Sequence, residues 1–157
     1  MMKLYKKIDG KLHYWETWDD DLTSASIHYG VVGDDGEHKI IEAKNFVELK
    51  TTIKKAIQDK ISEGYREIEE DDLDVLQIEY EIDGFGTEGD VEKRHYLLDR
   101  MNQMLGWKGL GHCDGGSSGN NTMEVCCYVV DFELAKKIIA QDLEGTDFAD
   151  YTRIYKE

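Results

Sequence analysis

The sequence predicts an α+β protein made of two small domains. Short strand-like runs precede a single helical segment in the first half, strand-like and helix-like segments alternate in the second, and a strongly acidic stretch lies between them. The expected boundaries are residues 1–68 for the first domain, 69–74 for an acidic linker and 75–157 for the second domain. Each domain is then close to the lower size limit for independent folding.

The first half contains four strand-like runs between residues 4 and 43. Asp9-Gly10 separates the first two runs and favours a two-residue hairpin turn. Asn45 stands where a helix N-cap is expected, and apolar residues then recur every three or four positions up to Gly64, a typical helix end. The stripe is expected to include Phe46 and Ile61. This half therefore predicts an antiparallel sheet with one long helix.

The second half has the order strand, helix, strand, strand, helix, strand. Its first strand, from Val75 to Ile82, alternates polar and apolar residues as a half-buried strand does. The glycine- and serine-rich segment from Gly115 to Asn121 is expected to be a loop between the two middle strands. Asp131 is a candidate N-cap of the second helix. This order predicts a ferredoxin-like βαββαβ module.

Three pieces of the first half resemble the WGR domain family. His28-Tyr29-Gly30-Val31-Val32-Gly33, followed by a glycine turn at Asp34-Asp35-Gly36, is similar to the family's Trp-Gly-Arg-Val-Gly signature. Phe46 and Ala56 match apolar positions of the family's helix. Lys60-Ile61-Ser62-Glu63-Gly64-Tyr65 resembles the helix ending of bacterial members. The resemblance covers about residues 2–68 and implies a WGR-like antiparallel sheet with one long helix.

Two positions of the signature differ from the family. Tyr29 stands where the family has Trp, and Val31 stands where it has Arg. In the poly(ADP-ribose) polymerases, WGR domains contribute to DNA-end recognition, and the resemblance implicates these two positions. A tyrosine ring can still stack on a sugar or base, but valine cannot pair with a phosphate. The resemblance therefore predicts the fold and disfavours nucleic-acid binding.

The net charge of −15, from 34 acidic and 19 basic residues, gives the same indication. Up to Leu73 the chain has 11 basic and 17 acidic residues, and after it 8 and 17, so the halves carry −6 and −9. Neither half is a basic module for nucleic acid or for an anionic membrane surface. The charge favours either a solvated cytoplasmic protein or an acidic face for another, basic protein.

The cysteines and the hydropathy pattern indicate a cytoplasmic location. Cys113, Cys126 and Cys127 form no paired framework, and an odd count fits a reducing compartment. No apolar run approaches the length of a membrane span, and no apolar signal-peptide core follows the first lysines. The cysteine and histidine spacing also lacks the pattern of a zinc site, so neither a metal nor a cofactor is expected.

The candidate binding residues form two groups. Trp15, Trp18 and Tyr29 are aromatic residues of the predicted first sheet, and Trp15 and Trp18, three positions apart, are expected on opposite faces. His112, Cys113 and Asp114 lie beside the predicted glycine-rich loop. Cys113 is a candidate nucleophile, but adjacent strand residues face opposite sides, which separates it from His112. No assembled catalytic set is predicted.

The sequence thus favours a non-enzymatic, bacterial-type WGR-domain protein that acts as a protein-interaction or regulatory binding module. Three alternatives remain open. One is an acidic immunity or inhibitor protein that covers a basic toxin or nuclease. Another is a nucleic-acid-associated WGR protein. The third is a cysteine-dependent enzyme with Cys113 as its nucleophile.

Overall fold

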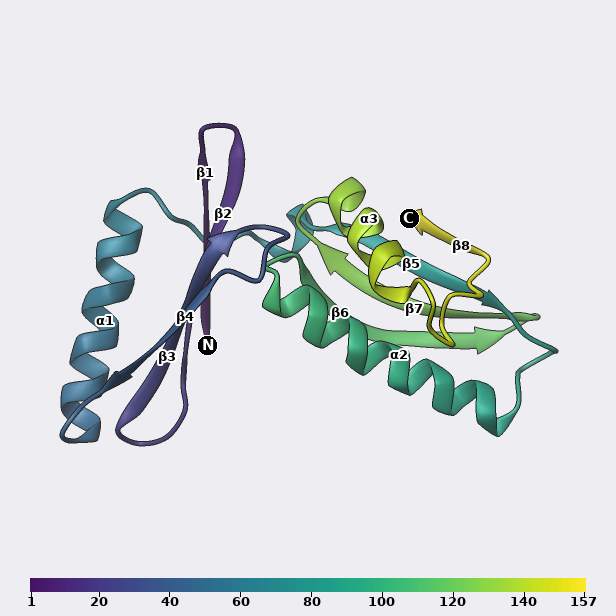
Figure 1. The fold of residues 1–157 in the computed structure, drawn as a ribbon, viewed down its shortest axis with the longest axis horizontal. Helices are drawn as coiled ribbons and strands as arrows, with labels where there is room; N and C mark the ends of the chain where they lie inside the picture. Colours follow the sequence, from purple (N-terminus) through teal and green to yellow (C-terminus); the bar gives the residue numbers. More distant parts are fainter. The chain divides into compact units, whose positions relative to one another are not determined.

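A computed structural model describes all 157 residues and divides them into two compact units, Met1–Glu69 and Glu70–Glu157. Each unit contains a four-stranded antiparallel sheet, and three α-helices complete an α+β protein (Figure 1). The boundary between the two units lies within the acidic stretch. Within it, Glu70–Asp72 forms a 3₁₀ turn and Asp74 already begins a strand. No helix is both long and apolar enough to cross a membrane.

The first unit is a meander of four strands in the order β1-β2-β3-β4, followed by one helix. Its elements are β1 (Met2–Ile8), β2 (Lys11–Asp19), β3 (Ser24–Val31), β4 (Glu37–Glu42) and α1 (Phe46–Ser62). Asp9 and Gly10 both have positive φ, so the predicted two-residue turn is confirmed. The side chain of Asn45 accepts a hydrogen bond from the Glu48 amide at 2.9 Å, as an N-cap does.

Helix α1 covers one side of this sheet. Leu4, Trp15 and Ile27 form a buried cluster with Tyr65, which follows the helix, and Ile53, Ala56 and Ile57 of α1 pack against them. The ends of the predicted apolar stripe differ from this pattern. Phe46 and Ile61 are exposed by 41 % and 40 % because they lie in the first and last turns of the helix, where the buried face ends.

The second unit has the strand order β6-β7-β5-β8, and all neighbouring strands are antiparallel. Its elements are β5 (Asp74–Glu81), α2 (Glu88–Trp107), β6 (Gly111–Gly119), β7 (Thr122–Val129), α3 (Phe132–Leu143) and β8 (Arg153–Lys156). The Asp131 side chain accepts a hydrogen bond from the Leu134 amide at 3.1 Å, which confirms the predicted N-cap of α3.

The predicted loop from Gly115 to Asn121 is wrong. Strand β6 continues to Gly119, with a bulge between Cys113 and Gly116, and only Asn120 and Asn121 form the hairpin turn. A Cβ atom at Gly116 would collide with the backbone carbonyl of Glu124, so the absent side chain permits the close strand pairing. Low strand propensity is overridden here by pairing with β7.

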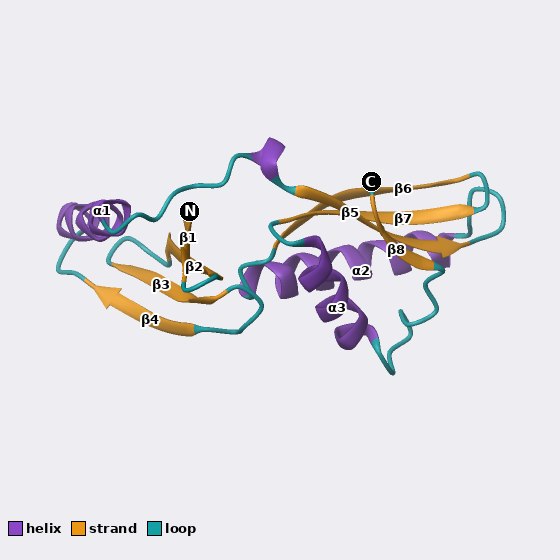
Figure 2. Ribbon diagram, turned by 90° about the horizontal axis from the view of Figure 1, so that it is seen from above, coloured by secondary structure: helices purple, strands orange, loops and turns teal.

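Both helices of the second unit lie on one side of its sheet (Figure 2). The side chains that face them are apolar and fully or almost fully buried. They include Leu76, Ile78 and Tyr80 of β5 and Met123, Val125, Cys127 and Val129 of β7. Leu97, Met101 and Leu105 of α2, with Ala135, Ile139 and Leu143 of α3, supply the helical half of this core. The opposite side of the sheet has no helix over it.

Candidate functional site

The side of the second sheet that lacks a helix is the candidate functional site, and we call it the open face. Its side chains alternate with the buried ones along β5, β7 and β8, and in β6 the register with β7 on each side of the bulge gives their positions. The open face consists of His112, Asp114 and Ser117 of β6, Glu124, Cys126 and Tyr128 of β7, Val75, Gln77, Glu79 and Glu81 of β5, and Arg153, Tyr155 and the adjoining Glu157.

Polar contacts order the middle of the open face. Glu79 accepts two hydrogen bonds from Arg153, from Nε at 2.9 Å and from Nη2 at 3.2 Å. Gln77 Nε2 donates to the Glu157 carboxylate at 2.7 Å, which holds that side chain over the adjacent strand β5. Glu79 and Gln77 are only 9 % and 8 % exposed, so these contacts satisfy groups that would be costly to bury alone.

Aromatic rings lie on both flanks of these polar groups. Tyr128 stacks on His112 with ring centroids 5.4 Å apart, and the Arg153 guanidinium lies 4.0 Å above the Tyr155 ring. A hydrogen bond with Cys126 raises the pKa of Tyr128, whereas burial and then the nearby charge of Glu124 raise the pKa of Tyr155. Both phenols therefore stay neutral near pH 7.

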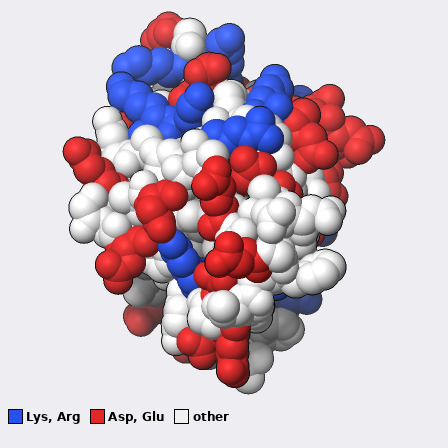
Figure 3. Space-filling view, turned by 90° about the vertical axis from the view of Figure 1, so that its right-hand side faces the viewer, with Lys and Arg blue, Asp and Glu red and all other residues white.

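The open face carries strong negative charge. Its five carboxylates, at Asp114, Glu124, Glu79, Glu81 and Glu157, are opposed by the single guanidinium of Arg153, which leaves a formal charge of −4. In the view of Figure 3, Asp and Glu side chains are scattered over the face that is turned toward the viewer. A surface of this kind attracts cations and repels phosphate.

Two of the predicted site residues lie on the open face and one does not. His112 is the cross-strand partner of Tyr128, and the charge of Asp114 acts on both Cys126 and Tyr128. Cys113 points to the opposite, helix-covered side and is 9 % exposed. The expected separation of His112 from Cys113 is therefore confirmed, and these two residues do not form a nucleophile–base pair.

The cysteines differ from the sequence expectation. Cys113 and Cys127 are directly opposed on β6 and β7 and form a disulfide, which leaves Cys126 as the free thiol. The prediction of three unpaired cysteines is wrong because strand register places residues 14 positions apart side by side. The odd cysteine count therefore no longer supports a reducing compartment. Cys113 has no free thiolate in this structure.

The remaining predicted residues lie in the first unit. Trp15 belongs to the buried cluster beneath α1, whereas Trp18 lies on the other side of the sheet and stacks on His38 with ring centroids 5.7 Å apart. The prediction that these tryptophans face opposite sides is confirmed. Trp15 is 3 % exposed, so its role in this structure is packing.

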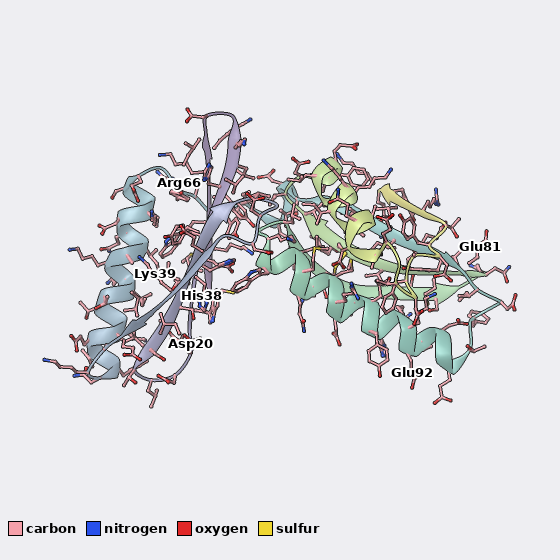
Figure 4. The ribbon with its side chains drawn as sticks, in the orientation of Figure 1. Asp20, His38, Lys39, Arg66, Glu81 and Glu92 are labelled. Carbon is pink, nitrogen blue, oxygen red and sulfur yellow. A yellow bond between two sulfur atoms is a disulfide. The ribbon has the colours of Figure 1, made fainter.

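Tyr29 lies on the α1 side of the first sheet, partly exposed at the edge of the core cluster. A hydrogen bond with Glu37 raises its pKa, and the Lys39 ammonium lies 6.0 Å from its ring centroid. Lys39 projects from β4 toward α1, and His38 projects to the opposite side (Figure 4). Lys39 also lines a shallow hollow with Lys60, Asp59 and Glu63, so both charges occur there in equal number.

Sequence reasoning missed the central residues of the open face. Glu124, Arg153 and Tyr155 carry no recognisable motif, and their proximity depends on pairing between β7, β5 and β8. One signal was present: the alternation in β5 places Gln77 and Glu79 opposite a fully apolar side. Combined with two amphipathic helices on a single side, that alternation identifies an uncovered polar face.

Comparison with known proteins gives no further assignment. No protein-family model, no curated protein and no solved structure shows significant similarity to this chain. The described residues also contain no group of three or more His, Cys, Asp or Glu side chains arranged to hold a metal ion. Functional inference therefore rests on the geometry and charge of the open face.

Proposed function

We propose that this protein is a non-enzymatic interaction module that binds a basic protein partner through the open face of its second unit. The observation that carries the proposal is the combination of an uncovered sheet side, a formal charge of −4 and aromatic rings at its flanks. Aromatic side chains supply contact area in protein interfaces, and complementary charge speeds and orients association.

The two units have different parts in this proposal. We infer that the first unit is a WGR-like domain without the signature tryptophan and arginine, since Tyr29 and Val31 occupy those positions and its strands form a meander followed by one helix. We infer that the second unit is ferredoxin-like, which the strand order β6-β7-β5-β8 supports. In that arrangement both helices protect one side of the sheet, and the other side is available for binding.

The charge of the open face favours a protein over nucleic acid. Phosphate binding draws most of its affinity from clustered lysine and arginine, and the open face offers one arginine already paired with Glu79. A basic toxin or nuclease is one kind of partner that fits this surface. The nucleic-acid-associated alternative has no comparable supporting observation.

A matched pair of charge reversals tests the proposal in the full chain. Glu81 lies at the end of β5 on the open face, and Glu92 is exposed on α2 (Figure 4). We expect Glu81→Lys to weaken binding of a nona-lysine peptide about 5-fold, and Glu92→Lys to weaken it less than 2-fold, as local rather than net charge governs a specific surface. Equal weakening by the two variants, which change the net charge equally, would contradict the proposal.

A further inference from the structure

A row of four side chains crosses the middle of the open face. Strand register aligns Ser117 of β6 with Glu124 of β7, Glu124 with Glu79 of β5, and Glu79 with Arg153 of β8. Two glutamates are therefore direct cross-strand neighbours. Like charges at such positions repel each other unless a cation lies close to both. The row contains one guanidinium for two carboxylates.

Arg153 shows how this surface holds a guanidinium. Its Nε and Nη2 atoms donate to the two carboxylate oxygens of Glu79, and its Cζ atom lies 4.0 Å from the Tyr155 ring centroid. The planar group thus combines a bidentate ion pair with stacking on an aromatic ring. Glu79, which is 9 % exposed, has its charge compensated within the chain.

Glu124 has no ion pair of its own, although the Arg153 guanidinium interacts with its charge at longer range. Its one hydrogen-bond partner is the Ser117 hydroxyl, at a long 3.4 Å, and no lysine or arginine nitrogen lies within 4.0 Å of its carboxylate. The side chain is partly buried, so water screens its charge less than it screens that of an exposed glutamate.

We propose that Glu124 is the docking point for an arginine side chain of the basic partner. This inference rests on the proposed function and names the residue that the open face uses for recognition. A guanidinium on Glu124 would donate to both carboxylate oxygens, as Arg153 does to Glu79, and would complete the row with one cation for each glutamate. Lysine fits less well, because its ammonium is a strongly hydrated point charge without a planar pair of donors.

Three peptides distinguish this inference from general attraction to basic chains. Nona-arginine and nona-lysine carry the same charge, and nona-citrulline keeps the shape of arginine without the charge. With the full chain at about 150 mM salt, we expect nona-arginine to bind about 10-fold more tightly than nona-lysine, the difference that one well-oriented bidentate pair supplies. Nona-citrulline should show no binding.

Substitutions test whether Glu124 produces the preference for nona-arginine over nona-lysine. Glu124→Gln should bring the arginine-to-lysine affinity ratio close to one, whereas Glu81→Gln, a control on the same face, should leave the ratio unchanged. Glu124→Gln removes a repulsion with Glu79, so the fold should be retained. Glu124→Asp provides a second variant, which keeps the charge but withdraws the carboxylate by one methylene, and it should also reduce the ratio.

The outcomes separate the two proposals. Equal affinities for nona-arginine and nona-lysine, or a preference that persists in Glu124→Gln, would overturn the arginine site while binding at the open face still supported the proposed function. If neither basic peptide shifts the NMR amide signals of open-face residues, both proposals fail. A preference for arginine that Glu124→Gln abolishes and Glu81→Gln retains supports both.

Discussion

Gly36 shows how a glycine in the connection between β3 and β4 is determined by its neighbours. It has a φ of +69°, and a Cβ atom there would collide with the Tyr14 hydroxyl and the Tyr29 carbonyl. The nearest atom to a Cβ placed on Gly30 is the Gly36 Cα, at 2.8 Å. The two glycines therefore allow the backbone on either side of the turn at Val32 and Gly33 to approach closely. Backbone packing therefore explains why both positions are glycine, independently of any ligand.

Replacement of Gly36 should therefore lower the free energy of unfolding more than replacement of a glycine that has a positive φ but no close neighbours. Gly10 has a φ of +81°, and no atom lies within 4 Å of the position that a Cβ atom would take there. We expect Gly36→Ala to lower the free energy of unfolding by about 2–4 kcal/mol and Gly10→Ala by about 1 kcal/mol. Urea unfolding monitored by tryptophan fluorescence measures both. Equal losses would show that the contacts with Tyr14 and Tyr29 contribute nothing.

The cysteines make a second prediction at the level of single residues. In protein purified without reductant and then denatured, iodoacetamide should label one thiol, and after reduction it should label three. In the native protein near pH 7 the single thiol should react slowly, because burial raises the pKa of Cys126 and lowers its thiolate fraction. Mass spectrometry counts the labels. Three labels without reduction would contradict the Cys113–Cys127 pairing.

Among the three α-helices, α2 has the most complete N-terminal capping. Thr87 Oγ1 accepts a hydrogen bond from the Asp90 amide at 3.2 Å, and the Asp90 carboxylate accepts one from the Thr87 amide at 2.8 Å. This capping box satisfies two amides that have no partner within the helix. Its acidic member also complements the positive end of the helix dipole.

Loss of this cap should weaken the second unit measurably. We expect Thr87→Ala to reduce the free energy of unfolding by about 1 kcal/mol, whereas Gln103→Ala, at an exposed position within α2, should change it by less than about 0.5 kcal/mol. Urea titration followed by circular dichroism tests the pair. No difference between the variants would mean that the capping box does not stabilise α2.

The elements that the sequence predicts well are those with local signals. Asp9-Gly10 determines a hairpin through its own dihedral preferences, and Asn45 and Asp131 cap helices through contacts three residues away. The second half of β6 was missed because its glycines and serines have low strand propensity, and only pairing with β7 makes them extended. The open face was missed for a similar reason. Its row from Glu124 to Arg153 depends on strand order, which no local pattern specifies.

At the scale of the whole molecule, part of the net charge of −15 lies on one defined surface, the open face. Acidic residues outnumber basic ones in both halves, yet the uncovered sheet side of the second unit combines its negative charge with aromatic rings and a partly buried carboxylate, Glu124, that has no ion pair of its own. General acidity favours solubility and self-repulsion, which any acidic protein shows. A surface that pairs charge with ordered aromatic groups can in addition distinguish between partners.

The most direct test of this account is a map of where a basic peptide binds. In a ¹⁵N-labelled full-length chain titrated with nona-lysine, we expect the largest amide shifts in β5, β7 and β8, with smaller changes in α2, α3 and the first unit. The shifts should diminish with added salt, since the attraction is electrostatic. Shifts spread evenly over acidic residues, or concentrated on the helices, would contradict the claim that the open face is the binding surface.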